Sequence, residues 1–174
     1  MTIDALKLRI DTPTGETFPG RGFYQLEEDS LYVQVGPFSR MHRFFSYLES
    51  DHVRLDLDKE GRLLFIEVDC PRHCWGVDTR VKPPNQAIPA DIRWLDFRKH
   101  MSDRELLTNK RRTFLLLRFQ SQFSVRNYLL ARSVAIDVTD KSELAAIWVS
   151  DIVDDVAGLG IADFRKNSCP REEN

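Results

Sequence analysis

Four acidic residues lie in one short stretch of the sequence, at a spacing that could hold a divalent cation. Asp56, Asp58 and Glu60 occupy alternate positions, and Gly61 and Glu67 follow them. This order nearly matches the calcium loop of an EF-hand, in which oxygen ligands come from alternate positions and a glutamate closes the loop. Carboxylates also suit Mg²⁺, and a metal-bound water could serve a hydrolase. The first candidate site is therefore a metal site formed by Asp56, Asp58, Glu60 and Glu67.

The residues on both sides of this stretch are typical of strands rather than of the helices that an EF-hand requires. Val53, Leu55 and Leu57 alternate with polar residues, which is the period of a half-buried strand. Residues 63–68 are mostly apolar and resume a strand pattern. In the alternative interpretation, Asp56 and Asp58 face solvent and help to form the turn of a hairpin.

Two cysteines and a histidine form a second candidate site. Cys70 and Cys74 enclose His73, and thiolates and imidazoles are the preferred ligands of Zn²⁺. A structural zinc site needs about four ligands. The missing ligand would have to come from His52, His100 or Cys169. In the alternative interpretation, the two cysteines are ordinary small residues of a loop.

Basic and aromatic residues offer a third type of chemistry, the binding of single-stranded nucleic acid. The basic residues with the most suitable positions are Arg98, Lys110, Arg111 and Arg112. The aromatic residues that could accompany them are Phe44, Phe45 and Trp94. The chain carries a formal net charge of -2, so bulk attraction to nucleic acid is not indicated. A solvated charged face is the alternative.

Composition and length favour a cytoplasmic protein without a membrane partner. The chain has 174 residues, of which 42% are hydrophobic, enough to bury a core. Three cysteines give no disulfide framework, no apolar run is long enough to span a bilayer, and the first residues lack the features of a signal peptide. The sequence contains no P-loop, nucleophile elbow, dinucleotide fingerprint or zinc-protease helix. Nothing in it therefore specifies a catalytic set.

The acidic stretch belongs to a pattern that occurs twice. Residues 52–69 match residues 133–150, and Val53 and Ile66 correspond to Val134 and Ile147, each 81 positions further along. Both copies keep the alternation of a strand, a polar turn and a second strand. Asp56 has the counterpart Asp137, whereas the other acidic positions are not repeated. The repeat predicts a duplicated β-unit with a shared core.

The remaining pattern predicts further strands and two or three short helices. We expect strands over 6–10, 23–26, 31–35, 92–97 and 113–119. Residues 40–50 suit a helix or a strand equally, and residues 123–131 correspond to them, with Tyr128 and Leu129 aligned to Tyr47 and Leu48. Ser102 and Glu105 form a capping-box pattern that predicts a helix over 102–108. Another short helix is expected near 151–157, and residues 166–174 read as a frayed polar end.

Residues 29–69 resemble a family of small bacterial domains of unknown function. That family has an Asp-x-Leu-Tyr strand followed by an Asp-x-Asp-x-x-Gly-Arg-Leu hairpin that ends in Ile-Glu. The matching residues here are Asp29, Leu31, Tyr32, Asp56, Asp58, Gly61, Arg62, Leu63, Ile66 and Glu67. Phe65 stands where the family usually has a second glycine. The resemblance implies a β-rich unit and carries no known activity.

These observations predict a mainly antiparallel β fold, at the margin of α+β, built from two repeats related by a pseudo-twofold. The repeats cover about 1–69 and 92–150 of a single unit, with an irregular connector over 70–91 and a C-terminal tail over 151–174. Exposed sheet edges and aromatic residues suggest a homodimer. The function that we predict is a non-catalytic binding or interaction module. A divalent-metal enzyme using the acidic hairpin and a nucleic-acid-binding protein are the alternatives.

Overall fold

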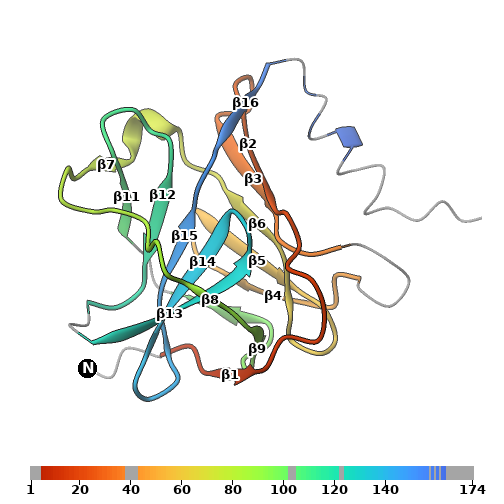
Figure 1. The fold of residues 1–174 in the computed structure, drawn as a ribbon. Coiled ribbons are helices and arrows are strands. Elements are labelled where there is room, and N and C mark those ends of the chain that lie inside the picture. Colours follow the sequence, from red (N-terminus) through yellow and green to blue (C-terminus); the bar gives the residue numbers. More distant parts are fainter. Residues whose placement is uncertain are drawn as a thin grey trace, which may run out of the picture.

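The computed structural model describes residues 5–37, 43–101, 105–121 and 124–156, together with residues 158, 160, 162 and 163. These residues form two seven-stranded sheets and one two-stranded ribbon (Figure 1). All strand pairs between neighbours in sequence are antiparallel, and the parallel pairs lie only at the sheet edges. The predicted mainly antiparallel β fold class is therefore confirmed.

Sheet I, as we name it, contains the first copy of the repeat. Its strand order is β10-β4-β5-β6-β3-β2-β16. In that order the strands are Lys99–His100, Ser46–Glu49, Val53–Leu57, Leu63–Val68, Ser30–Gln34, Arg21–Gln25 and Val153–Asp155.

Sheet II contains the second copy, and its strand order is β7-β11-β12-β15-β14-β13-β8. In that order the strands are Gly76–Val77, Glu105–Thr108, Leu115–Arg118, Leu144–Val149, Val134–Thr139, Val125–Ala131 and Ile88–Pro89. The five central strands of each sheet have the same connectivity, because β4-β5-β6-β3-β2 corresponds one by one to β13-β14-β15-β12-β11.

The edge strands cross between the two units in a reciprocal way. Strand β7 follows the first unit in sequence but pairs in parallel with β11 of sheet II. Strand β16 follows the second unit but pairs in parallel with β2 of sheet I. Each unit therefore completes the sheet of the other, which is the arrangement expected for two units related by a pseudo-twofold.

A short ribbon joins the two units at the lower end of Figure 1. It consists of β1 (Leu8–Asp11) and β9 (Asp91–Trp94), which pair antiparallel with Leu8 opposite Trp94. The Trp94 backbone N–H donates to the carbonyl of Gly61 at 2.7 Å, and the Leu8 N–H donates to the carbonyl of Ser142 at 2.9 Å. Gly61 and Ser142 occupy equivalent turn positions of the two hairpins, so the ribbon holds both hairpins in the same way.

The core lies between the inner faces of the two large sheets. Alternate residues of each strand point inward, and the same cluster contains Leu55 and Ile66 from sheet I and Ile136 and Ile147 from sheet II. All four side chains are fully buried. Because one apolar cluster takes side chains from both repeats, each unit depends on the other for the burial of its inner face.

Two local predictions from the sequence are wrong. Residues 105–108, expected as the end of a helix, form strand β11, and residues 153–155, expected in a helix, form strand β16. The proposed cap Ser102 and the polar end 166–174 lie outside the described residues. In the ambiguous stretch 40–50, residues 46–49 are a strand.

The match between β4 and β13 also needs a correction. Asp56 pairs with Tyr47, whereas Asp137 pairs with Asn127, so Tyr47 corresponds to Asn127 rather than to Tyr128. The connector over 70–91 contains one turn of 3₁₀ helix, Arg72–Cys74, in addition to β7 and β8. No helix in the described part of the chain has the length and apolar character needed to cross a membrane.

Candidate functional site

The four acidic residues of the predicted metal site lie in the β5–β6 hairpin. Asp56 lies in β5 and Glu67 in β6, while Asp58 and Glu60 lie in the turn between the strands. Strands stand where an EF-hand would have helices. Across the described ranges, no three His, Cys, Asp or Glu side chains come close enough together to hold a metal ion. The hairpin therefore brings the four carboxylates near one another without arranging them around one point.

Asp58 closes the turn of the hairpin. Its Oδ1 atom accepts hydrogen bonds from the backbone N–H of Glu60 at 2.8 Å and of Arg62 at 2.9 Å. The side chain is 1% exposed, so the expectation that Asp58 faces solvent is wrong. These bonds satisfy backbone donors that a tight turn leaves without partners. The observed contacts give Asp58 a structural role.

Asp56 lies on the outer face of sheet I and is also buried rather than solvent-facing. The Arg54 Nε atom donates to Asp56 Oδ1 at 3.0 Å. Burial raises the pKa of Asp56 above its usual value, and the hydrogen bond and charge of Arg54 oppose that rise. Glu67 lies opposite Arg54 in the register, and burial together with Asp56 and Asp69 raises its pKa as well.

The cysteine loop does not gather the ligands of a zinc site within the described residues. Cys70 is half-buried and packs against the core, while His73 and Cys74 are exposed on the 3₁₀ turn. Burial raises the pKa of the Cys70 thiol, so the free thiol stays protonated near neutral pH. His52 contacts the carbonyl of Asp69 through Nδ1 at 3.1 Å. Cys169 lies outside the described residues.

One of the aromatic residues expected on the basic and aromatic face is buried in the structure. Trp94 is 1% exposed, so its ring cannot stack on a base. Arg112 donates through Nε to the carbonyl of Arg72 at 3.2 Å. Phe44 and Phe45 remain exposed beside sheet I.

A cavity at the junction of the two units takes its walls from both repeats. We name it the junction cavity; its volume is about 180 Å³. Its walls come from the segment between β1 and β2, the end of β3, the start of β6, the β8–β9 segment and β13. The side chains that form most of its surface are apolar: Phe18, Val35, Leu63, Leu64, Ile92, Leu129 and Leu130.

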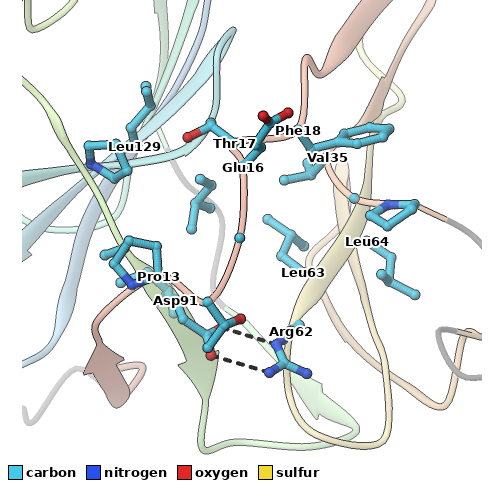
Figure 2. A pocket seen from close by; sticks show the side chains of 18 residues that line it. Pro13, Glu16, Thr17, Phe18, Val35, Arg62, Leu63, Leu64, Asp91 and Leu129 are labelled. Carbon is cyan, nitrogen blue, oxygen red and sulfur yellow. Dashed lines mark hydrogen bonds and ion pairs between the residues drawn. The ribbon is translucent and has the colours of Figure 1, made fainter.

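Figure 2 shows how the walls face one another. Leu129 and Pro13 lie on one side, and Val35, Leu63 and Leu64 lie on the other. Glu16 and Thr17 lie between them on the segment that crosses the cavity. The cavity therefore has apolar walls from both repeats and a rim that carries polar groups.

One ion pair fixes the lower end of this cavity. Arg62 donates to Asp91 twice, from Nε to Oδ1 at 3.0 Å and from Nη2 to Oδ2 at 3.2 Å (Figure 2). A third donor of the same guanidinium bonds to Glu60. The Arg62 hydrogen bonds hold the pKa of Asp91 below its usual value. This bidentate ion pair joins the first hairpin to the ribbon. Each of its two charged groups already has its partner within the protein.

The turn glycine explains why Arg62 reaches Asp91. Gly61 has a φ of 84°, and a Cβ atom there would lie 2.3 Å from the carbonyl oxygen of Trp94. Glycine allows both the left-handed backbone and the close approach of the ribbon. Arg62 follows directly and lies beside Asp91 of the ribbon, so the hairpin and the ribbon fix the cavity together.

This cavity could not be predicted from the sequence, because its walls come from five distant segments. Of the wall segments, residues 89–91 fall in the predicted connector, Ile92 begins a predicted strand, and Arg62 belongs to the family motif. Their prolines and glycine, Pro13, Gly15 and Pro89, are signals of turns and not of a site.

No protein-family model matches this chain, and no curated protein matches it either. The resemblance to small bacterial domains of unknown function stays a prediction.

Proposed function

We propose that this protein is a non-catalytic binding module of the cytoplasm and that the junction cavity is its ligand site. The observation that carries the proposal is a mostly apolar cavity of about 180 Å³ whose two charged groups at the lower end, Arg62 and Asp91, already pair with each other. Binding pockets in proteins are typically concave and mostly apolar, with few polar groups.

The size and lining favour a small, mostly apolar ligand. A cavity of roughly 150 Å³ lined by aliphatic and aromatic side chains is large enough to bind benzene. Leu63, Leu64 and Leu129 offer such a lining from both units. Thr17 and Glu16 at the rim could orient a polar substituent of the ligand.

The electrostatics of the cavity favour binding over acid–base catalysis. A general acid or base works best when its pKa lies near the working pH. Asp91 has a lowered pKa and Arg62 a raised one, so both groups stay charged near neutral pH. Metal-dependent hydrolysis at the acidic hairpin has less support, because Asp58 is occupied by its turn.

The proposal is tested by a titration with toluene followed through the methyl NMR signals of the protein. We expect the methyl groups of Leu63, Leu64 and Leu129 to shift together and to saturate. A Gly15→Phe variant should weaken binding at least tenfold, because a Cβ at Gly15 meets no non-neighbouring atom within 4 Å and the added ring can fill the cavity mouth.

The matched control is Thr79→Phe, which adds the same ring at an exposed position away from the cavity. This variant should bind toluene like the natural protein. Shifts spread over the whole molecule, or equal binding by Gly15→Phe, would refute the junction cavity as the ligand site.

A further inference from the structure

The outer faces of the two sheets carry equivalent rows of residues in register. In sheet II, the row crosses β11, β12, β15, β14 and β13 and consists of Glu105, Arg118, Ala146, Asp137 and Asn127. In sheet I, the row crosses β2, β3, β6, β5 and β4 and consists of Arg21, Gln34, Phe65, Asp56 and Tyr47. An aspartate occupies the fourth position of both rows.

The two rows differ most at their centre. Phe65 fills the middle of the row in sheet I and is 1% exposed, stacked against Tyr32 with ring centres 6.0 Å apart. Alanine takes this position in sheet II, and a hollow of about 300 Å³ opens there, bordered by Leu116, Arg118, Val125, Asp137, Ala146 and Trp148. The replacement of a large ring by a methyl group accounts for the hollow.

The two aspartates also differ in their partners. Asp56 has a cation, Arg54, at 3.0 Å. Asp137 accepts hydrogen bonds from the neutral donors Asn127 Nδ2 at 2.6 Å and Trp148 Nε1 at 3.0 Å. The position that matches Arg54 in sheet II is Ala135. Of the residues that the structure describes, none forms an ion pair with Asp137, although its carboxylate borders the hollow.

The charges of the row in sheet II favour the binding of one cation. Arg118 lies on the other side of Ala146 from Asp137, but it already pairs with Glu105 at 3.2 Å. The row holds two carboxylates, Glu105 and Asp137, and one guanidinium, so its formal charge is negative. Burial raises the pKa of Asp137, and the charge of Arg118 together with the two hydrogen bonds opposes that rise. A half-buried carboxylate whose hydrogen-bond donors are both neutral is a strong acceptor for a charged donor.

We propose that this hollow in sheet II binds a small organic cation, an amine or amidinium group on an apolar body. The cationic group would donate to Asp137, and the apolar body would lie on Ala146 against Leu116 and Val125, where the ring of Phe65 lies in sheet I. The hollow is separate from the junction cavity, so the two proposals stand independently.

Benzylamine is the test probe, and benzyl alcohol is its neutral counterpart of nearly the same shape. We expect benzylamine to shift the NMR signal of the Trp148 indole N–H in a saturable way, with an affinity at least tenfold higher than that of benzyl alcohol. Asp137→Asn should weaken benzylamine binding at least tenfold. Ala146→Phe, which copies sheet I, should abolish it.

The matched control is Asp56→Asn, which removes the equivalent carboxylate of the filled row and should leave benzylamine binding unchanged. The dispersion of the NMR spectrum shows whether each variant is folded, and Asp137→Asn decides the question if Ala146→Phe is not. Equal binding of the alcohol and the amine, an equal loss in both aspartate variants, or no shift of Trp148 would overturn the proposal.

Discussion

At the scale of single residues, the carboxylates of the first repeat make different contacts although they lie close in sequence. Asp58 forms the turn, Asp56 pairs with Arg54 on the outer face, and Glu60 bonds to Arg62. Alternation along the chain predicted that Asp56 lies on a strand. It could not predict that Asp58 is buried, because burial depends on the ribbon that packs over the turn.

Removal of the Asp58 side chain should destabilise the protein. In Asp58→Ala, two partly buried backbone N–H groups lose their acceptor, which costs about 1–3 kcal/mol. Asp58→Asn keeps an acceptor oxygen at the same place and should lose clearly less. Urea denaturation at pH 7 measures both free energies of unfolding. Equal losses in the two variants would contradict the role assigned to this oxygen.

Glu67 should make stability fall as pH rises. Its pKa is raised in the folded state by burial, Asp56 and Asp69, so the folded protein binds this proton more tightly than the unfolded chain. The natural protein therefore gains stability as pH falls through the raised pKa toward the usual value. Glu67→Gln lacks this gain.

We expect the natural protein to lose a few tenths to about 1 kcal/mol of stability relative to Glu67→Gln between pH 4 and pH 7. Paired urea titrations at the two pH values measure the difference. A natural protein that becomes more stable than the variant as pH rises would show that Arg54 outweighs the other groups around Glu67.

At the scale of elements, the strands of the two copies could be predicted because their apolar residues alternate and the turns are polar. The helix over 102–108 was predicted from a capping box, a signal that is entirely local. Leu106 and Leu107 instead pair with Leu117 and Leu116 of β12. Sheet pairing therefore outweighs the local capping-box signal. Edge strands β7, β8 and β10 have two residues each and are too short to show a period.

The hairpin turns of the two units give a matched pair of tests. Gly61→Ala should cost more than about 2 kcal/mol, because the added Cβ meets the Trp94 carbonyl and the backbone has a positive φ. Ser142 occupies the equivalent position with a φ of 58°, so Ser142→Gly should be neutral or stabilise by up to about 1 kcal/mol.

Thermal unfolding of both variants checks this pair. A small effect of Gly61→Ala would mean that the ribbon can move away from the turn at little cost. A clear loss in Ser142→Gly would mean that its side chain contributes more than its backbone strain costs.

At the scale of the whole molecule, the repeat predicted two related units with one core. The reciprocal exchange of β7 and β16 could not be predicted, because nothing in the sequence marks which sheet a two- or three-residue strand will join. The walls of the junction cavity likewise combine segments of both units. The edge strands are only two or three residues long and offer little backbone for pairing, so the homodimer stays a prediction.

The shared core predicts one cooperative unfolding transition. Leu55→Ala in sheet I and Ile136→Ala in sheet II should each cost about 2–5 kcal/mol, because both side chains are fully buried in the same cluster. Calorimetry should show a single transition that both variants shift to lower temperature. Two separate transitions, each sensitive to one variant, would show that the units fold independently.

The two units are proposed to form a ligand cavity at their junction. A crystal structure of the protein under xenon pressure tests this most directly, because xenon enters apolar cavities of this size. We predict a xenon atom between Leu63 of the first unit and Leu129 of the second, near the Arg62–Asp91 pair. A junction filled by side chains, or occupied only by ordered water, would contradict the claim.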